Sequence, residues 1–155
     1  MNSTGVSADD LLFMEQALQL ASNSAAHGEV PVGCVLVSNG MVIAQSGNSP
    51  ISNIDPTAHA EINAIRLGAQ HFKNYRLIGT TLYSTLEPCA MCAGAITHAR
   101  IERLVFGAYD KKSGACGSVI DLFGNKQLNH HTSVVGGVME DQCAASLKSF
   151  FKKRR

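Results

Sequence analysis

Four residues in two short motifs carry the chemistry that this sequence suggests. Cys89 and Cys92 are three positions apart and follow Pro88, while His59 and Glu61 stand upstream in a His-x-Glu motif. One histidine nitrogen and two cysteine sulfurs suit zinc, and three protein ligands leave the fourth tetrahedral position open for water. An open position is typical of catalytic rather than structural zinc sites. Glu61 would then be the acid–base group that takes a proton from that water and delivers one to a substrate.

The Cys-x-x-Cys motif alone leaves other kinds of site open. It also fits a redox pair, or one half of a four-cysteine structural zinc site. The sequence has no second Cys-x-x-Cys motif, and a thioredoxin-like pair would not need the His-x-Glu upstream. The other cysteines, Cys34, Cys116 and Cys143, stand alone, and an odd total of five does not indicate a disulfide framework. We expect these three to be packing residues or passive thiols.

The elements that must position these motifs can be predicted from hydrophobic spacing and turn residues. Helices are expected from an N-cap at Ser7 to about Gly28, over 58–67 with a stop at Gly68, over 88–98, and over 140–151. Strands are expected at 32–37, 41–44, 81–86, 104–106 and 134–138, with a loop over 47–56. The Asn39-Gly40 dipeptide between the first two strands suits a tight hairpin turn.

Both motifs are expected at helix starts. Proline is favoured in a first turn, where two cysteines at i and i+3 project to the same side. The unpaired N–H groups and the positive dipole end there lower a thiol pKa, which favours thiolate ligands. His59 and Glu61 would point about 200° apart in a regular helix. We therefore expect His59 to lie where the helix is only beginning.

The order of elements predicts an α/β fold. Strands that alternate with helices require parallel crossovers, and the opening hairpin adds an antiparallel pair. We expect a three-layer α/β/α architecture with a mixed five-stranded sheet, in a single domain over residues 1–155. With 45% hydrophobic and 16% charged residues, the composition excludes a disordered chain. No run of eighteen apolar residues and no secretory signal is present, so we expect a cytoplasmic protein without a membrane segment.

The net charge of +1 is unevenly distributed. Residues 148–155 hold five of the 13 basic residues and none of the 12 acids, so the rest of the chain is acidic. A basic end on an acidic body suggests a patch for a polyanion. Lysines and arginines also favour a helix C-terminus because they complement the macrodipole, and this feature alone does not separate the two explanations.

Taken together, these motifs resemble those of the bacterial tRNA-specific adenosine deaminases, within the cytidine-deaminase-like superfamily. The His-x-Glu and Pro-Cys-x-x-Cys combination is the signature of zinc nucleobase deaminases. The resemblance covers nearly the whole chain and lies in residues 29–33, Asn48, 55–62, 74–77, 85–95, 105–108, Asp110 and 129–130. The motifs at 29–33 and 129–130 separate the tRNA enzymes from deaminases of free bases better than the zinc motif does.

The resemblance implies a homodimer with one zinc ion per subunit that converts the wobble adenosine of a tRNA anticodon stem-loop to inosine. It implies that His59, Cys89 and Cys92 bind zinc and that Glu61 shuttles protons. The resemblance also implies substrate contacts, with Asn48 on the inserted nucleotide, Glu29, Val30 and Pro31 near the pocket, Asp110 and His130 by flanking nucleotides, and Phe151 with the basic tail on the stem-loop. Tyr109 stands where the family leads us to expect a basic residue, and residues 123–128 match poorly.

Two other functions compete with this interpretation. A deaminase of a free base or nucleoside would have the same zinc site and differ in pocket shape. The basic residues 152–155 and the Phe150-Phe151 pair weigh against it, because they suit phosphate and stacking contacts. A zinc-stabilised RNA-binding module without catalysis is the second alternative, and Glu61 weighs against it because a structural site does not need a free carboxylate.

Overall fold

The structure is a computed structural model that describes residues 5–154, so the predictions that rest on residues 1–4 and on Arg155 lie outside the described residues. The elements follow in the order α1 (Ala8–Ala26), β1 (Gly33–Ser38), β2 (Met41–Gly47), α2 (Pro50–Asn53), α3 (Ala60–Phe72), β3 (Thr80–Leu86), α4 (Ala90–His98), β4 (Arg103–Ala108), β5 (Ser133–Val135) and α5 (Glu140–Lys153). No helix within residues 5–154 is both long enough and apolar enough to span a bilayer.

The five strands form one mixed sheet in the order β2-β1-β3-β4-β5. Strand β1 is antiparallel to both β2 and β3, whereas β3, β4 and β5 are parallel. The β1–β2 turn has positive φ at both central residues, 52° at Asn39 and 75° at Gly40, which matches the turn that an Asn-Gly pair favours. Helix α4 makes the crossover between β3 and β4. The predicted mixed five-stranded sheet is confirmed.

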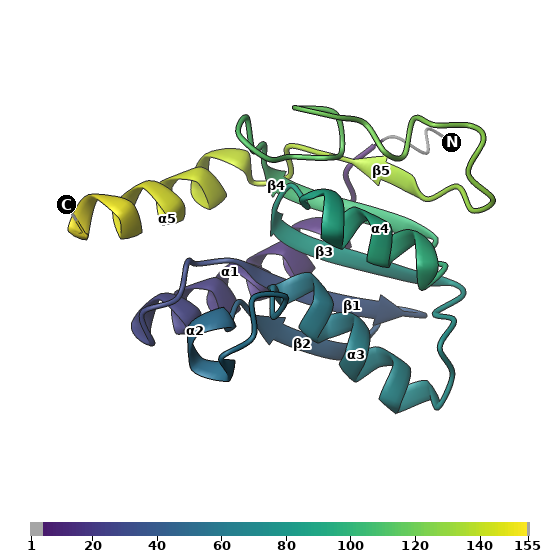
Figure 1. Ribbon diagram of the computed structural model, residues 1–155, viewed down its shortest axis with the longest axis horizontal. Helices are drawn as coiled ribbons and strands as arrows, with labels where there is room; N and C mark the ends of the chain where they lie inside the picture. The colour runs from purple at the N-terminus through teal and green to yellow at the C-terminus, as the bar shows by residue number, and fades with distance from the viewer. Residues whose placement is uncertain (1–4, 155) are drawn as a thin grey trace.

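Helices cover the two faces of this sheet (Figure 1). Successive strand side chains point to opposite faces, so Leu36 and Leu82 pack with α3 and α4 on one face. The neighbouring Val35 and Tyr83 pack with α1 and α5 on the other. The result is the predicted three-layer α/β/α arrangement.

A buried ion pair fastens the start of α1 to the sheet. Asp10 is 1% exposed and accepts hydrogen bonds from both terminal nitrogens of Arg103 (2.8 Å each) and from the Tyr83 hydroxyl (2.7 Å). Ser7 caps the helix, since its hydroxyl accepts from the Asp10 N–H (3.1 Å). These contacts fix α1 against β3 and β4, and the far end of α1 then lies beside the candidate site.

The prediction that α3 stops at Gly68 is wrong, because the helix continues to Phe72. Gly68 is buried, and a Cβ at this position would lie 2.4 Å from Leu36 Cδ2. The glycine allows the helix to approach the sheet closely, which is a packing reason that a sequence pattern cannot separate from a helix stop.

Other boundaries also differ from the prediction. Helix α4 begins at Ala90 rather than at Pro88, with Cys89 as its N-cap, and β4 is longer than predicted (Arg103–Ala108). Strand β2 extends to Gly47 because its pairing with β1 continues to Gly33. The predicted loop over 47–56 includes the short helix α2, which Pro50 begins. Strand β5 ends at Val135, before the paired glycines 136 and 137, and Gly137 has a φ of 83°.

Candidate active site

Two helix starts bring the predicted metal ligands together. His59 is the N-cap of α3 and Cys89 is the N-cap of α4, and both have extended backbone (ψ 155° and 177°). Cys92 lies in the first turn of α4. The expectation that His59 precedes the regular helix is confirmed, and this placement leaves its ring free to turn toward the cysteines. The ligand atoms of the three residues lie within 4.8 Å of one another.

The spacing of these three atoms fits zinc. His59 Nδ1 lies 3.7 Å from Cys89 Sγ and 3.4 Å from Cys92 Sγ. A tetrahedral ion with Zn–N and Zn–S bonds of about 2.05 and 2.3 Å places such a nitrogen and sulfur about 3.6 Å apart. One nitrogen and two sulfurs are also a donor set that zinc prefers. The cluster therefore fits one zinc ion with an open fourth position.

The protonation of the cysteines reflects their closeness. Hydrogen bonds from Cys92 and from His59 lower the pKa of the Cys89 thiol to about 4. The same hydrogen bond, together with burial, raises the pKa of the Cys92 thiol far above its usual range. The hydrogen bond to Cys89 raises the pKa of His59. A bound metal holds coordinating thiols deprotonated, so a zinc ion at this position would be bound by both cysteines as thiolates.

Glu61 lies in the first turn of α3 and is 4% exposed. Burial raises the pKa of its carboxyl group to about 7, against the opposing attraction of His59. Its charge in turn acts on His59 and on Cys92. The structure thus places a buried carboxyl group beside the three-ligand cluster, as the His-x-Glu spacing predicts.

Asn48 lies in the loop that joins β2 to α2. This loop is at the same end of the sheet as the cluster, because β2 and β3 both end there. Its N–H donates to the Val32 carbonyl (2.9 Å), and its own carbonyl accepts from the Ser24 hydroxyl (3.0 Å). Its side chain is half-buried and forms no hydrogen bond with any described residue. The backbone of Asn48 is fixed, while its amide is left available.

Glu29 binds the backbone of α2, which follows the Asn48 loop. It is 2% exposed, and its two carboxylate oxygens accept from the backbone N–H groups of Ile51 (3.2 Å) and Ser52 (2.7 Å). Burial opposes ionisation, but these hydrogen bonds outweigh it and lower the pKa of Glu29. Glu29 therefore holds the start of α2, and the next two residues, Val30 (half-buried) and Pro31 (buried), lead into β1.

A residue that the sequence analysis did not single out, Glu87, organises the loop on the other side of the cluster. It is 1% exposed and accepts from the N–H groups of Asp110 (3.0 Å), Cys116 (3.0 Å) and Ser118 (3.1 Å), and from the Ser118 hydroxyl. The loop pairs with the Glu87–Cys89 segment through a β-bridge between Gly114 and Cys89 of the cluster. The only sequence feature that could have pointed to Glu87 is its position directly before the Pro-Cys of the zinc motif.

Two residues predicted beside flanking nucleotides have internal partners. Asp110 is half-buried, and its carboxylate accepts from the N–H groups of Lys112 (3.0 Å) and Ser113 (3.2 Å) and from the Ser113 hydroxyl (2.9 Å). His130 Nε2 lies 2.7 Å from the Ile101 carbonyl, before the start of β4. Asp110 follows the other end of β4, so the two residues lie toward opposite ends of that strand.

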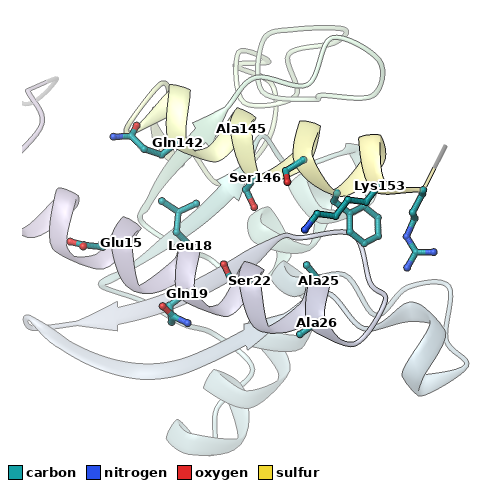
Figure 2. Close-up of a pocket in the computed structure, with 13 residues that line it drawn as sticks. Glu15, Leu18, Gln19, Ser22, Ala25, Ala26, Gln142, Ala145, Ser146 and Lys153 are labelled. Carbon is teal, nitrogen blue, oxygen red and sulfur yellow. The ribbon is translucent and has the colours of Figure 1, made fainter.

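The C-terminal helix α5 forms one wall of a groove of about 1170 Å³, and α1 forms the other (Figure 2). Phe150, Lys153 and Arg154 line one end of it. Arg154 lies over the Phe150 ring (4.5 Å) and donates to the Gly28 carbonyl (2.9 Å). The basic end of α5 is thereby fastened beside Glu29. Phe151 is 48% exposed, and none of the cluster residues lines the groove.

The three remaining cysteines have the passive surroundings that we expect. Cys34 and Cys143 are buried in the two cores, one on each face of the sheet. Cys116 is half-buried, and its thiol donates to the Pro88 carbonyl (3.7 Å). Burial raises the pKa of each thiol.

Comparisons with known proteins agree with this geometry. Residues 7–108 match the family described as the cytidine and deoxycytidylate deaminase zinc-binding region. A tRNA-specific adenosine deaminase of Haemophilus influenzae is 52% identical over 147 residues, which cover 94% of this chain and 85% of the relative.

Two solved structures are also similar. One comes from a study of A-to-I editing by tRNA:A34 deaminases at the wobble position of transfer RNA, with a TM-score of 0.85, 46% identity, and coverage of 88% of this chain and 99% of the other. The guanine deaminase of Bacillus subtilis gives a TM-score of 0.63 and 34% identity, with coverage of 83% and 78%. By identity over nearly the full length, the chain belongs to the tRNA-specific adenosine deaminases, within the cytidine and deoxycytidylate deaminase zinc-binding family.

Proposed function

We propose that this chain hydrolyses the wobble adenosine of a tRNA anticodon to inosine and releases ammonia. The observation that carries the proposal is a buried carboxyl group, Glu61, beside a three-ligand His/Cys/Cys cluster. Three ligands leave room for a water at the metal, and a free carboxyl group beside it has a use in hydrolysis but none in a structural site.

In this proposal His59, Cys89 and Cys92 hold one zinc ion per subunit. When bound, zinc supplies the Lewis acidity that lowers the pKa of a water from 15.7 to about 7 and so makes it a nucleophile at neutral pH. The helix starts that carry these ligands add positive dipole ends, which favour the thiolate forms.

Glu61 moves the protons of the reaction. Its carboxylate takes a proton from the attacking water and gives it to N1 of the adenine ring as oxygen bonds to C6. It then takes the remaining proton from the oxygen now bonded to C6 and transfers it to the exocyclic amino group, the C6–N bond breaks, and ammonia leaves. Burial of Glu61 keeps bulk water away from the carboxyl group, so that these protons are exchanged with substrate rather than solvent.

The substrate contacts are assigned by the family resemblance and by position. Asn48, whose amide is free, binds the inserted nucleotide, and Val30 and Pro31 line the pocket. Glu29 supports the pocket through α2, because both of its oxygens already hold backbone N–H groups.

The remaining contacts are to nucleotides outside the pocket. Asp110 lies by a flanking nucleotide and contributes through the turn that it caps. His130 lies toward the opposite end of β4, so it contacts a nucleotide farther from the pocket, through the loop before β5. Exposed Phe151 and the basic end of α5 meet the anticodon stem-loop, an arrangement supported by the Arg154–Gly28 contact beside Glu29.

The proposal also covers the assembly and the place of reaction. Residues 1–155 act as one deaminase domain, and two copies form a homodimer, as the family resemblance implies. The reaction takes place in the cytoplasm, where tRNA is available.

The experiment incubates zinc-loaded protein with an anticodon stem-loop that carries adenosine at the wobble position. A matched stem-loop with guanosine there, and free adenosine, cytosine and guanine, run in parallel. Inosine in the first stem-loop alone, and its loss in Glu61→Gln, is the expected result. Deamination of a free base without change to the stem-loop overturns the substrate. Activity that survives in Glu61→Gln overturns the proton-transfer role.

A further inference from the structure

One side chain, Asn63, ties the Asn48 loop to the helix that begins at the metal cluster. Asn63 lies on α3 and is half-buried. Its Nδ2 donates to the Gly47 carbonyl (3.0 Å), the Ser49 hydroxyl (2.9 Å) and the Ala58 carbonyl (3.3 Å). The amide therefore bridges both chain neighbours of Asn48 to the segment that leads into α3.

We propose that Asn63 is a positioning residue, which fixes the Asn48 amide relative to the metal cluster and thereby sets how the inserted nucleotide is held. This inference rests on the proposed function, because it concerns how the same pocket reads its substrate. Asn63 is not required to touch the substrate or the metal itself.

The backbone around Asn48 is held by hydrogen bonds, whereas the Asn48 side chain forms none with the described residues. The Asn48 N–H is bound to Val32, and its carbonyl is bound to the Ser24 hydroxyl of α1. Ser24 reaches this carbonyl because Gly47 has no side chain: a Cβ there would lie 2.1 Å from the Ser24 oxygen. On the opposite face of the sheet, the Ser49 N–H is bound to the Ala58 carbonyl (2.9 Å), and Asn63 adds a side-chain anchor. A polar group on a backbone anchored this way is preorganised, which is what a substrate contact needs.

The chemistry of the contact requires a donor at residue 63. Two carbonyls and one hydroxyl face the Asn63 nitrogen, and a primary amide offers two N–H groups to them. Asn63→Asp has nearly the same shape but replaces the NH₂ group with an oxygen that can only accept. That oxygen faces two carbonyl oxygens, so the loop must move away.

The first arm of the test is hydrogen exchange, which does not depend on activity. The N–H groups of Asn48 and Ser49 are protected by the carbonyls of Val32 and Ala58 (2.9 Å each). In Asn63→Asp we expect these two amides to exchange at least about tenfold faster, while amides in the centre of β1 and the zinc content stay unchanged.

The control variant is Asn53→Asp. Asn53 is exposed on α2 and donates to the same Ser49 hydroxyl (3.0 Å), but it contacts neither carbonyl. We expect its exchange pattern and its activity to match the wild type. Asn63→Ala removes the donors without adding a charge, and it replaces Asn63→Asp in both arms if the aspartate variant does not fold.

The second arm is a double-mutant cycle in kcat/KM with the stem-loop. Misplacing a substrate contact costs up to about 100-fold, so we expect Asn63→Asp to lower kcat/KM by about 10- to 100-fold. In an Asn48→Ala background the same change should have less than about a threefold effect, because the contact that Asn63 positions is already absent.

The outcomes separate this inference from the proposed function. The positioning role is refuted if hydrogen exchange at Asn48 and Ser49 is unchanged in Asn63→Asp. It is also refuted if Asn63→Asp lowers kcat/KM by the same factor in the Asn48→Ala background as in the wild type. If the wild-type protein does not deaminate the stem-loop, the proposed function fails, and the exchange arm still decides whether Asn63 fixes the loop.

Discussion

Replacing Glu87 with glutamine tests how the loop over residues 110–118 is held against the metal cluster. Each carboxylate oxygen of Glu87 accepts two hydrogen bonds, one pair from Asp110 and Ser118 and the other from Cys116 and Ser118. Glutamine keeps the shape but exchanges one oxygen for an NH₂ group. If the NH₂ group faces the Cys116 and Ser118 N–H groups, two of the four hydrogen bonds are lost. If it faces the Asp110 N–H and the Ser118 hydroxyl, the hydroxyl can turn to accept from it, and only the Asp110 hydrogen bond is lost.

The magnitude follows from this count. Hydrogen bonds to charged groups contribute about 1.5–3 kcal/mol each, so the orientation that loses one of them costs about 1.5–3 kcal/mol and the other about twice as much. Ser118 is exposed and can turn its donors to water, which favours the lower end. A loss of about 1.5–3 kcal/mol in local stability corresponds to roughly 10- to 100-fold faster exchange of the loop amides. Because Gly114 pairs with Cys89, we also expect zinc affinity to fall by about tenfold.

The assay is hydrogen exchange of the Cys116 and Ser118 amides, with zinc affinity measured by competition with a chelator. Glu102→Gln serves as the control, since Glu102 is exposed and should leave both readouts at the wild-type level. Exchange at Cys116 and Ser118 within twofold of the wild type in Glu87→Gln would refute the reasoning, because it would mean that the buried carboxylate does not hold the loop.

Three further predictions concern stability. Arg103→Leu leaves Asp10 buried without its cation, which costs about 3 kcal/mol and should lower Tm by at least about 6 °C. Burial opposes ionisation of Asp10, but the hydrogen bonds from Arg103 hold its pKa well below the usual range. The stabilisation is therefore fully present above the unfolded-state pKa of about 4 and is lost progressively as the pH falls from there toward the lower folded-state pKa. The Tm deficit of the variant relative to the wild type, measured by thermal unfolding at pH 7 and pH 3.5, should therefore be smaller at pH 3.5. Gly68→Ala should lower Tm by about 2–6 °C, because the added Cβ would lie 2.4 Å from Leu36 Cδ2. Gly94→Ala in α4 is the control and should raise Tm, because a Cβ there meets no other atom within 4 Å. Equal shifts of Tm for the two variants in calorimetry would contradict this prediction. Removing zinc with a chelator should lower Tm by about 5–10 °C, and zinc but not magnesium should restore it; an unchanged Tm would mean that the cluster does not bind zinc.

The metal cluster could be predicted because its geometry is local. A cysteine pair at i and i+3 near a helix start, and a histidine at another helix start, are fixed by helix geometry and by Pro88. The sheet was predictable for a similar reason, since a short apolar run such as 32–37, followed by turn residues, is typical of a strand that is buried on both faces, as Val35 and Leu36 are.

The loop anchors could not be predicted from the sequence. Asn63 and Glu87 reach partners that are 16 and 31 positions away, and a polar residue in a helix or after a strand has no pattern that marks such a contact. Gly68 misled the prediction for a related reason, because a glycine at a helix end and a glycine under a helix–sheet contact look alike in one dimension. In each case tertiary packing decides, and local propensity does not report it.

The spacing of the metal ligands and the positions of the surrounding loops depend on different parts of the structure. The metal ligands stand on helix starts that are packed on the sheet, so their spacing depends on the core. The surrounding loops depend on single polar side chains, with Asn63 and Glu29 on one side and Glu87 on the other. A change of one loop anchor can therefore alter how a substrate is held while the core that spaces the ligands remains intact. The β-bridge to Cys89 makes Glu87 the exception, because its loop touches a ligand directly. Among the three anchors, substitution of Glu87 should thus affect zinc retention and substrate reading together, whereas substitution of Asn63 or Glu29 should affect substrate reading alone.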